Sequence, residues 1–401
     1  MSKRLAGISI LVADDQMDVV RTLCTSLREA GASLHFVTDG HAALSHVSMW
    51  PIDLLIVDLK MPPGEWGGLW LLEQLQNQGQ RVPSFVLSGE GWGVREAFRL
   101  GAVDYIEKTE AAQDLFSRCA ETVDKFQVEA LDKAGKELPT PLAYRFARYE
   151  STADPDKKLL EGLLAVEEIL RFGSIIGLSS TEPVPLRGIN RQQISSLSMG
   201  TWLDLCIALA NIPTADVSFT QFWSWLAPKK SDRDLVRSLV RLRNDIAHGR
   251  PPDHTMSALL EHLLRRFTHR ALGLWRAELA VPQAMSYNGH SFEATYSSIT
   301  GLGPPKYGTI RTTKPLTTGH PVLLSPTRQP LSLTPWLVAR TDEATGSVRC
   351  LQFDGTVRRP GSDNTVPLRY TPTDGHRDDT PTDVPGGGCW GDLEPWAADS
   401  G

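Results

Sequence analysis

LLIVDLKMP at residues 54–62 places a run of apolar residues directly before an acidic one, and ILVADD at residues 10–15 repeats this arrangement. VLSGE at residues 86–90 and AVDYIEK at residues 102–108 likewise end short apolar runs with polar groups. Short, continuously apolar runs are typical of strands that are buried on both faces of a parallel sheet. The first 126 residues therefore predict an α/β fold, a doubly wound parallel sheet of five strands connected by helices.

Polar side chains follow the predicted strands, namely Asp14, Asp15, Asp58, Ser88 and Lys108. In an open parallel sheet the carboxyl ends of the strands lie at one edge, so these groups are expected to converge there. Three carboxylates at one edge repel one another unless a divalent cation neutralises them, and ligands that are all oxygen suit Mg²⁺. The set predicts a phosphoryl-transfer site in which Asp58 is the carboxylate nucleophile.

Together the four segments resemble the receiver domain of two-component response regulators, a flavodoxin-like fold, over residues 5–126. The resemblance implies that a histidine kinase or a phosphotransfer protein donates a phosphoryl group to Asp58. The implied Mg²⁺ ligands are Asp14, Asp15, Asp58 and the backbone carbonyl of Lys60. Ser88 and Lys108 would contact the phosphoryl oxygens, and Tyr105 would be the switch aromatic. A doubly wound domain with merely solvated carboxylates is the alternative, and five matching positions in the expected order argue against it.

Two features near this predicted site depart from the family pattern. Thr109 follows Lys108, where the family usually has proline. The loop after Asp58, LKMPPGEWGG, is longer than usual and carries Trp66. We expect the chemistry to survive both changes, because none of the five key groups is missing, whereas the kinetics and the switching could differ.

The composition limits the class of protein. The chain has 401 residues, enough for two or three domains, and 41% hydrophobic residues, enough to fill real cores. No apolar run approaches the ~20 residues that a membrane span needs, and the first strand begins too early for a signal peptide. Five scattered cysteines fit neither a disulfide framework nor a zinc site, so a reducing cytoplasm is expected. The net charge of −6 argues against a chain that coats nucleic acid through bulk charge.

Four further segments follow the α/β domain. Residues 127–141 predict a helical extension and linker, in which a helix from Ala111 runs to about Ala134 and ends at Gly135 and the following prolines. That helix packs on its own sheet or, beyond the sheet, forms a dimer contact or a rod to the next domain. Residues 142–280 predict an all-α bundle, residues 281–370 a small β-rich module, and residues 371–401 a disordered acidic tail.

The expected bundle helices are defined by apolar periodicity. They cover Lys157–Gly173, residues 200–210 and 218–226, a helix that starts with Ser231 as its N-cap and stops at Gly249, and Met256–Leu279.

RLRNDIAHG in the fourth of these helices carries a second motif, Arg243-Asn244-Asp245-Ile246-Ala247-His248. It resembles the R-N-x-x-x-H pattern of HEPN domains, helical bundles that in many cases are ribonucleases. Asn244 and His248 are four residues apart and so share a helix face. A histidine can move the proton of a ribose 2′-hydroxyl, and a guanidinium can hold the phosphate. The resemblance implies a metal-independent endoribonuclease acting on RNA, with a homodimer supplying one composite site.

Other readings of the second motif remain open. His248 stands just before Gly249 and could simply stabilise a helix end, and Arg243 could pair with Asp245 or Glu261. The bundle would then be a non-enzymatic module that binds a partner protein or nucleic acid. A DNA-binding transcription factor ranks third, because only Ile194–Leu205 faintly suggests a helix-turn-helix.

Overall fold

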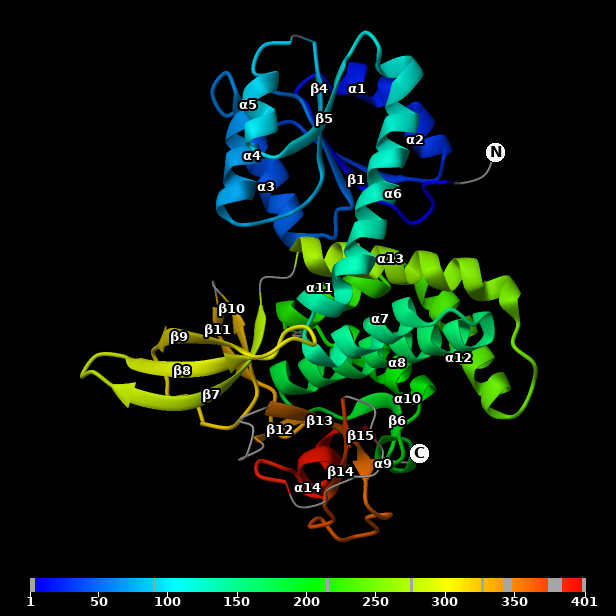
Figure 1. Cartoon of the computed structure of the whole chain (residues 1–401), viewed down its shortest axis with the longest axis vertical. Helices are drawn as coiled ribbons and strands as arrows, with labels where there is room; N and C mark the ends of the chain where they lie inside the picture. The colour runs from blue at the N-terminus through cyan, green and yellow to red at the C-terminus, as the bar shows by residue number, and fades with distance from the viewer. Residues whose placement is uncertain are drawn as a thin grey trace. The chain divides into compact units, whose positions relative to one another are not determined.

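The computed structural model describes residues 4–89, 91–213, 216–274, 277–325, 328–341, 348–373 and 384–398 (Figure 1). Its contacts divide the chain into two compact units. Unit 1 contains residues 1–132 and 265–275, and unit 2 contains residues 133–264 and 276–401. Two helices, α6 (Ala111–Glu137) and α13 (Ser257–Leu274), therefore contribute residues to both units.

Unit 1 is built on five parallel strands in the order β2-β1-β3-β4-β5. The strands are β1 (Ser9–Ala13), β2 (Ser33–Val37), β3 (Leu54–Val57), β4 (Ser84–Ser88) and β5 (Ala102–Glu107). Because alternate residues of a strand point to opposite faces, Ile10 and Val12 enter one core and Leu11 and Ala13 enter the other. Burial on both faces explains why these strands are continuously apolar, and the predicted doubly wound fold is confirmed.

Helices cover both faces of this sheet (Figure 1). The helices α1 (Met17–Leu23), α2 (Thr25–Glu29) and α6 pack on one face, and α3 (Gly40–Met49), α4 (Gly67–Asn77) and α5 (Val94–Arg99) pack on the other. Residues Leu115, Cys119 and Val123 of α6 are buried against the first of these faces. The prediction that Gly135 ends this helix is wrong: α6 continues to Glu137, and Gly135 lies inside it with little room beside Ala147.

Residues 265–275 complete unit 1 through a buried ion pair. The guanidinium of Arg270 donates to both carboxylate oxygens of Asp53, from Nε to Oδ1 at 2.8 Å and from Nη2 to Oδ2 at 2.6 Å. Both side chains are almost wholly buried. Arg270 also donates to the carbonyl of Gly7 at 3.0 Å, and the backbone N–H of Ser9 donates to Asp53 Oδ2 at 2.7 Å. Burial alone would raise the pKa of Asp53, but the attraction of Arg270 outweighs it, so this pKa is lowered.

His269 adds a second contact to the same strand. Its Nε2 lies 2.9 Å from the carbonyl oxygen of Asp53, and because a carbonyl can only accept, Nε2 carries the proton. Burial of the ring lowers the pKa of His269, although the nearby Asp53 opposes this effect. Further along, the N–H of Arg81 donates to the carbonyl of Gly273 at 3.1 Å, and Leu274 packs against the core under α3 and α4.

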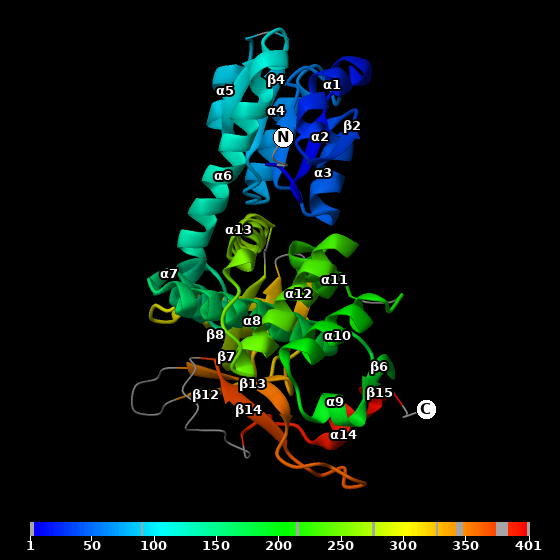
Figure 2. The same cartoon turned by 90° about the vertical axis from the view of Figure 1, so that its right-hand side faces the viewer.

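The helical region of unit 2 contains α7 (Thr140–Ser151), α8 (Pro155–Ser180), α9 (Arg191–Ser195), α10 (Met199–Ala210), α11 (Val217–Leu226), α12 (Lys230–Ala247), the short η1 (His254–Met256) and the first part of α13. In this region α8 packs against α7, α10, α11 and α12 (Figure 2). Gly162, Gly173 and Gly177 let α8 approach the side chains of Leu260, Phe222 and Leu209 closely. The expected helices are all present, and α8 is longer than predicted.

Two predicted helix ends in this unit are wrong. Ser231 lies within α12, whose N-cap is Lys229, and the side chain of Asp232 accepts a hydrogen bond from the Lys229 N–H at 3.1 Å. The helix α13 ends at Leu274 and not at Leu279, because Glu278–Tyr287 form strand β7, paired on both sides.

Two antiparallel sheets follow the bundle. The first has the order β11-β10-β7-β8-β9 and the second the order β12-β13-β14. The remaining strands are β8 (Phe292–Ser298), β9 (Lys306–Thr312), β10 (Val322–Ser325), β11 (Arg328–Ser332), β12 (Leu337–Thr341), β13 (Val348–Thr356) and β14 (Leu368–Pro372). The β-rich character predicted for residues 281–370 is therefore confirmed.

The prediction of a disordered tail over residues 371–401 is wrong for its described parts. Thr371 and Pro372 belong to β14, and α14 (Trp390–Leu393), η2 (Glu394–Trp396) and β15 (Ala397–Ala398) follow. Trp390 and Trp396 are fully buried. The many glycines, prolines and acids of this segment had suggested that too little apolar surface would be buried to offset the entropy lost on folding. The burial of two large aromatic side chains offsets that entropy.

The bundle and the β sheets form one unit. Strand β6 (Leu186–Asn190) of the helical region pairs in parallel with β15 near the end of the chain. Glu168 of α8 accepts a hydrogen bond from the Gln352 amide of β13, and burial raises the pKa of this carboxyl. Arg191 of α9 pairs with Glu394 at 2.6 Å. The predicted bundle and the β-rich module thus lie together in unit 2, except for residues 265–275 of the bundle, which belong to unit 1.

All five cysteines are free thiols. None of the helices in the described ranges is long and apolar enough to cross a membrane.

Replacing Arg270 with alanine should destabilise unit 1 strongly. Removing one partner of a buried pair leaves an uncompensated charge, here Asp53, at a cost of about 3–5 kcal/mol. Arg99→Ala is the control, because Arg99 forms an exposed pair with Glu96 at 2.9 Å and should cost at most about 1 kcal/mol. Urea unfolding of the full chain, followed by hydrogen exchange in β1 and β3, measures both. Equal effects of the two variants would contradict this role for Arg270.

The stability of unit 1 should fall as the pH drops below the ordinary pKa of histidine. The unfolded chain binds a proton at His269 below pH ~6.5, whereas the folded chain, with its lowered pKa, does not until a lower pH. The slope should approach about 1.4 kcal/mol per pH unit between the two pKa values. Melting temperatures from pH 7.5 to pH 5.5 give the slope. His269→Gln keeps a donor for the Asp53 carbonyl and cannot titrate, so an unchanged slope in this variant would refute the assignment.

Candidate functional site

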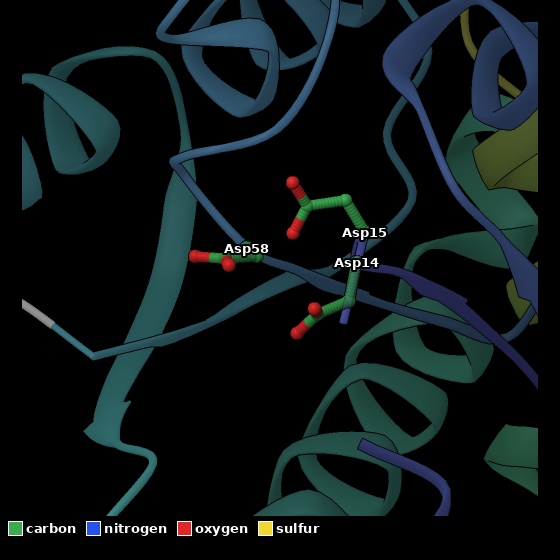
Figure 3. A group of neighbouring side chains, drawn as sticks. All are labelled: Asp14, Asp15 and Asp58. Carbon is green, nitrogen blue, oxygen red and sulfur yellow. The ribbon is translucent and has the colours of Figure 1, made fainter. Parts of the chain in front are cut away.

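Three carboxylates meet at the carboxyl edge of the unit 1 sheet (Figure 3). Asp14 and Asp15 follow β1, and Asp58 follows β3. One oxygen from each of the three lies within 4.8 Å of the others. Asp14 and Asp58 are buried, whereas Asp15 is exposed, so the cluster is open to solvent on one side.

Lys108 bridges the two buried carboxylates. Its Nζ lies 2.8 Å from Asp58 Oδ2 and 2.8 Å from Asp14 Oδ2. Burial alone would lower the pKa of Lys108, but its hydrogen bonds to Asp14 and Asp58 outweigh burial and raise it. Burial raises the pKa of Asp14, against the opposing effect of Lys108. Three carboxylates and one ammonium leave a net charge of −2, which fits a divalent cation held by oxygen ligands.

The loop after β3 positions Asp58 through its own backbone. The N–H of Lys60 donates to Asp58 Oδ1 at 3.3 Å. A Cβ atom on Gly68 would lie 2.1 Å from the carbonyl oxygen of Asp58, so only glycine allows α4 to begin this close to it. The long loop noted in the sequence is therefore closed tightly against the acidic residue.

The other predicted residues lie on β4, on β5 and in the turn that follows β5. Ser88 is buried at the end of β4, and its carbonyl accepts the N–H of Lys108 at 3.0 Å. Tyr105 packs against the core under α3 and α4, and its hydroxyl is buried without a hydrogen-bond partner among the described residues. Burial raises the pKa of Tyr105, and Glu107 adds to this effect. The side chain of Thr109, which replaces the usual proline, donates to Glu107 at 3.3 Å.

The fold and this site define a known class of domain. Residues 10–120 match the family described as response regulator receiver domain. This match confirms the resemblance found in the sequence, and residues 10–120 form a receiver domain of the kind used in two-component phosphorelays.

Several known proteins are similar to the first part of this chain. It is 33% identical over 113 residues to the two-component response regulator PhoP of Pseudomonas aeruginosa, covering 28% of this chain and 49% of that protein. It is 35% identical over 111 residues to the Regulator of RpoS of Escherichia coli K12, covering 27% and 32%. The solved receiver domain of NtrX from Brucella abortus is 27% identical and covers 29% of this chain and 98% of that one, with a TM-score of 0.27. The chain spans between about a fifth and a half of the length of the curated relatives it matches.

The second motif lies at the end of α12, in unit 2. Arg243 is partly exposed, and its Nε lies 3.5 Å from Glu167 Oε2 of α8. This partner differs from the two weighed from the sequence, since Asp245 pairs with Arg250 at 2.7 Å. Asn244 and His248 are exposed, and His248 is the C-cap of the helix, followed by Gly249 with φ of 80°. In the described ranges no hydrogen bond or ion pair involves the imidazole of His248.

Two further features were missed in the sequence. One is the buried set of Asp53, His269 and Arg270. The sequence feature that could have indicated it is that His269 and Arg270 lie between the apolar residues of α13. The other is a hollow of about 600 Å³ lined by Trp66, Leu69 and Trp92 together with Arg95, Glu96 and Arg99. Trp92 is 78% exposed, and its ring centroid lies 6.5 Å from that of Trp66. Trp66 was noted only as part of a long loop.

Proposed function

We propose that this protein is a phosphorelay response regulator in which Asp58 accepts a phosphoryl group from a histidine kinase or a phosphotransfer protein. The observation that supports this proposal is the cluster of Asp14, Asp15 and Asp58, with Lys108 at 2.8 Å from two of them. In the reaction an Asp58 oxygen forms the new bond to phosphorus, and the bond from phosphorus to the donor's nitrogen breaks.

Asp14, Asp15, Asp58 and the backbone carbonyl of Lys60 are the proposed ligands of Mg²⁺. The cation supplies charge neutralisation for an incoming anionic phosphoryl group. Lys108 already hydrogen-bonds Asp58 and can move to the added phosphoryl oxygens, and the Ser88 hydroxyl stands at the end of the next strand. Tyr105 is the proposed switch residue, because its buried hydroxyl can gain a partner if Ser88 or its loop shifts.

For unit 2 we propose an output that cleaves RNA. His248 is the proton-shuttling residue and Arg243 the phosphate-binding residue, with Asn244 beside them. The exposure of Asn244 and His248 supports this role, since a substrate can reach both. A homodimer through the helical bundle would bring two such motifs together, as in the families that the motif resembles.

A second output is favoured by one specific observation. Glu167 forms an ion pair with the guanidinium of Arg243. An RNA phosphate would have to compete with this carboxylate for the same cation. With that pair intact the bundle is a non-enzymatic module that binds a partner protein or nucleic acid. A helix-turn-helix role is disfavoured, because Trp202, Leu203 and Leu205 of α10 are buried and cannot read a groove.

Asp58 should be the sole phosphoryl acceptor. Incubation with acetyl phosphate and Mg²⁺ should add one phosphoryl mass to the full chain, and excess EDTA should prevent the addition, because the carboxylate cluster repels an anionic donor without a cation. Asp58→Asn should not be labelled. The matched control is Asp18→Asn, an exposed aspartate in the first turn of α1 that should label normally. Labelling of Asp58→Asn at the normal level would overturn the site.

His248 should be required for RNA cleavage. A labelled single-stranded RNA should be degraded by the wild-type chain and not by His248→Ala, while the melting temperature changes little, since a helix-end interaction contributes only about 0.3–1 kcal/mol. Arg243→Lys should also lose activity, because a point charge does not reproduce a planar fork. His290→Ala, at an exposed turn of unit 2, serves as control. If no RNA is cut and His248→Ala lowers the melting temperature sharply, the bundle is a docking module.

A further inference from the structure

The two edge strands of the first sheet in unit 2, β11 and β9, differ in their suitability for pairing with another strand. Edge strand β11 carries Pro330 in its middle, and its register with β10 is interrupted. Both features hinder the addition of another strand. Edge strand β9 has no proline, and its seven residues pair with β8 in one uninterrupted register from Lys306 to Thr312. Within this sheet β11 is therefore protected by its backbone, whereas β9 carries only two charged side chains, Lys306 and Arg311, as protection.

The outer edge of β9 is open. In the described ranges its backbone pairs with β8 alone, and β9 is the last strand of the sheet. Just beyond its end, the hydroxyl of Thr313 donates to the Gln329 side chain of β11 at 3.3 Å. Tyr307 is 74% exposed, and the side chain of Arg311 is 75% exposed. Arg311 has a weak contact with Glu293 of β8 at 3.5 Å, so its guanidinium is not buried by that pair.

We propose that β9 pairs antiparallel with β9 of a second copy of this chain, with Thr309 opposite itself. A two-fold axis through Thr309 pairs all seven residues of the strand. It sets Tyr307 opposite Arg311 of the second copy, twice in each dimer, and the exposed aromatic ring then lies beside a guanidinium. It also sets Lys306 opposite Thr312, so neither cation of the strand faces another cation.

The opposite face of the strand fits the same register. Gly308 comes opposite Ile310 of the second copy. The ring of Tyr296 covers Gly308 so closely that a Cβ atom there would lie 2.5 Å from its hydroxyl oxygen. Ile310 is half-buried against the cluster of Ala280, Val322 and Leu324 in its own chain, so this face permits the register without adding much new contact.

Charge disfavours the competing registers. A parallel pair would place Arg311 beside Arg311 and Lys306 beside Lys306, and an antiparallel pair centred on Arg311 would again oppose two guanidiniums. Like charges directly opposite each other destabilise strand pairs. The two cations therefore disfavour a parallel pair and an antiparallel pair centred on Arg311. The inference is independent of the proposed phosphorelay and of RNA cleavage.

A pair of seven-residue strands buries less area than the ~1,600 Å² of a standard interface, so a weak dimer that dissociates on dilution is expected. Sedimentation equilibrium of the full chain from about 1 to 300 μM should show a monomer–dimer equilibrium in this range. Tyr307→Lys puts an ammonium opposite Arg311 and should raise the dissociation constant roughly tenfold or more, because two pairs change in each dimer. Tyr307→Glu offers Arg311 a carboxylate and should keep or strengthen the dimer, with a new dependence on salt.

The control is Tyr287→Lys, the same change at a 60% exposed tyrosine of β7 in the same sheet. It should leave the dissociation constant unchanged, and the melting temperatures of all three variants should agree with the wild type. A monomer throughout the concentration range would overturn the proposal. So would a dimer that Tyr307→Lys leaves intact, which would belong to another surface such as the bundle, or one that Tyr287→Lys weakens equally.

Discussion

The buried ion pair between Asp53 and Arg270 is the constraint on which unit 1 depends. Neither charge could remain in that interior alone, because the cost of removing an ion from water is returned only by a partner with good geometry. Two hydrogen bonds join the pair directly, and Gly7, Ser9 and the His269 contact fix its surroundings. The packing of unit 1 therefore requires Arg270 of α13, which is 217 residues from Asp53 in sequence.

The same chemistry operates at the other edge of the sheet with a different outcome. Lys108 satisfies two buried carboxylates but leaves a third, Asp15, exposed, so the cluster keeps excess negative charge. At the Asp53 end one carboxylate faces one guanidinium, and both are closed to solvent. At the Asp58 end three carboxylates face one ammonium, and Asp15 is open to solvent. The enclosed pair makes the loss of either partner costly, whereas the open cluster with its excess negative charge attracts a cation.

The sequence predicted what depends on local order and on one topological rule. Apolar runs located the strands, and because parallel strands end at one edge, Asp14, Asp58 and Lys108 could be placed together without coordinates. The docking of residues 265–275 could not be predicted, since nothing local shows that Arg270 pairs with Asp53. Composition misled for residues 384–398, because Trp390 and Trp396 find cores that only the folded unit provides. Gly135 was read as a helix stop, although its neighbour in space, Ala147, decides its role.

Unit 1 is made of two segments that are separated in sequence by residues 133–264, and this has a consequence for folding during translation. Residues 1–132 leave the ribosome well before Arg270 does. At the usual 5–20 residues per second, the 138 residues between positions 132 and 270 take roughly 7–28 s. Throughout that interval the nascent N-terminal region holds Asp53 without its guanidinium, so its native state is incomplete. The emerging chain is therefore expected to be a client of ribosome-associated chaperones until the last turns of α13 have been translated.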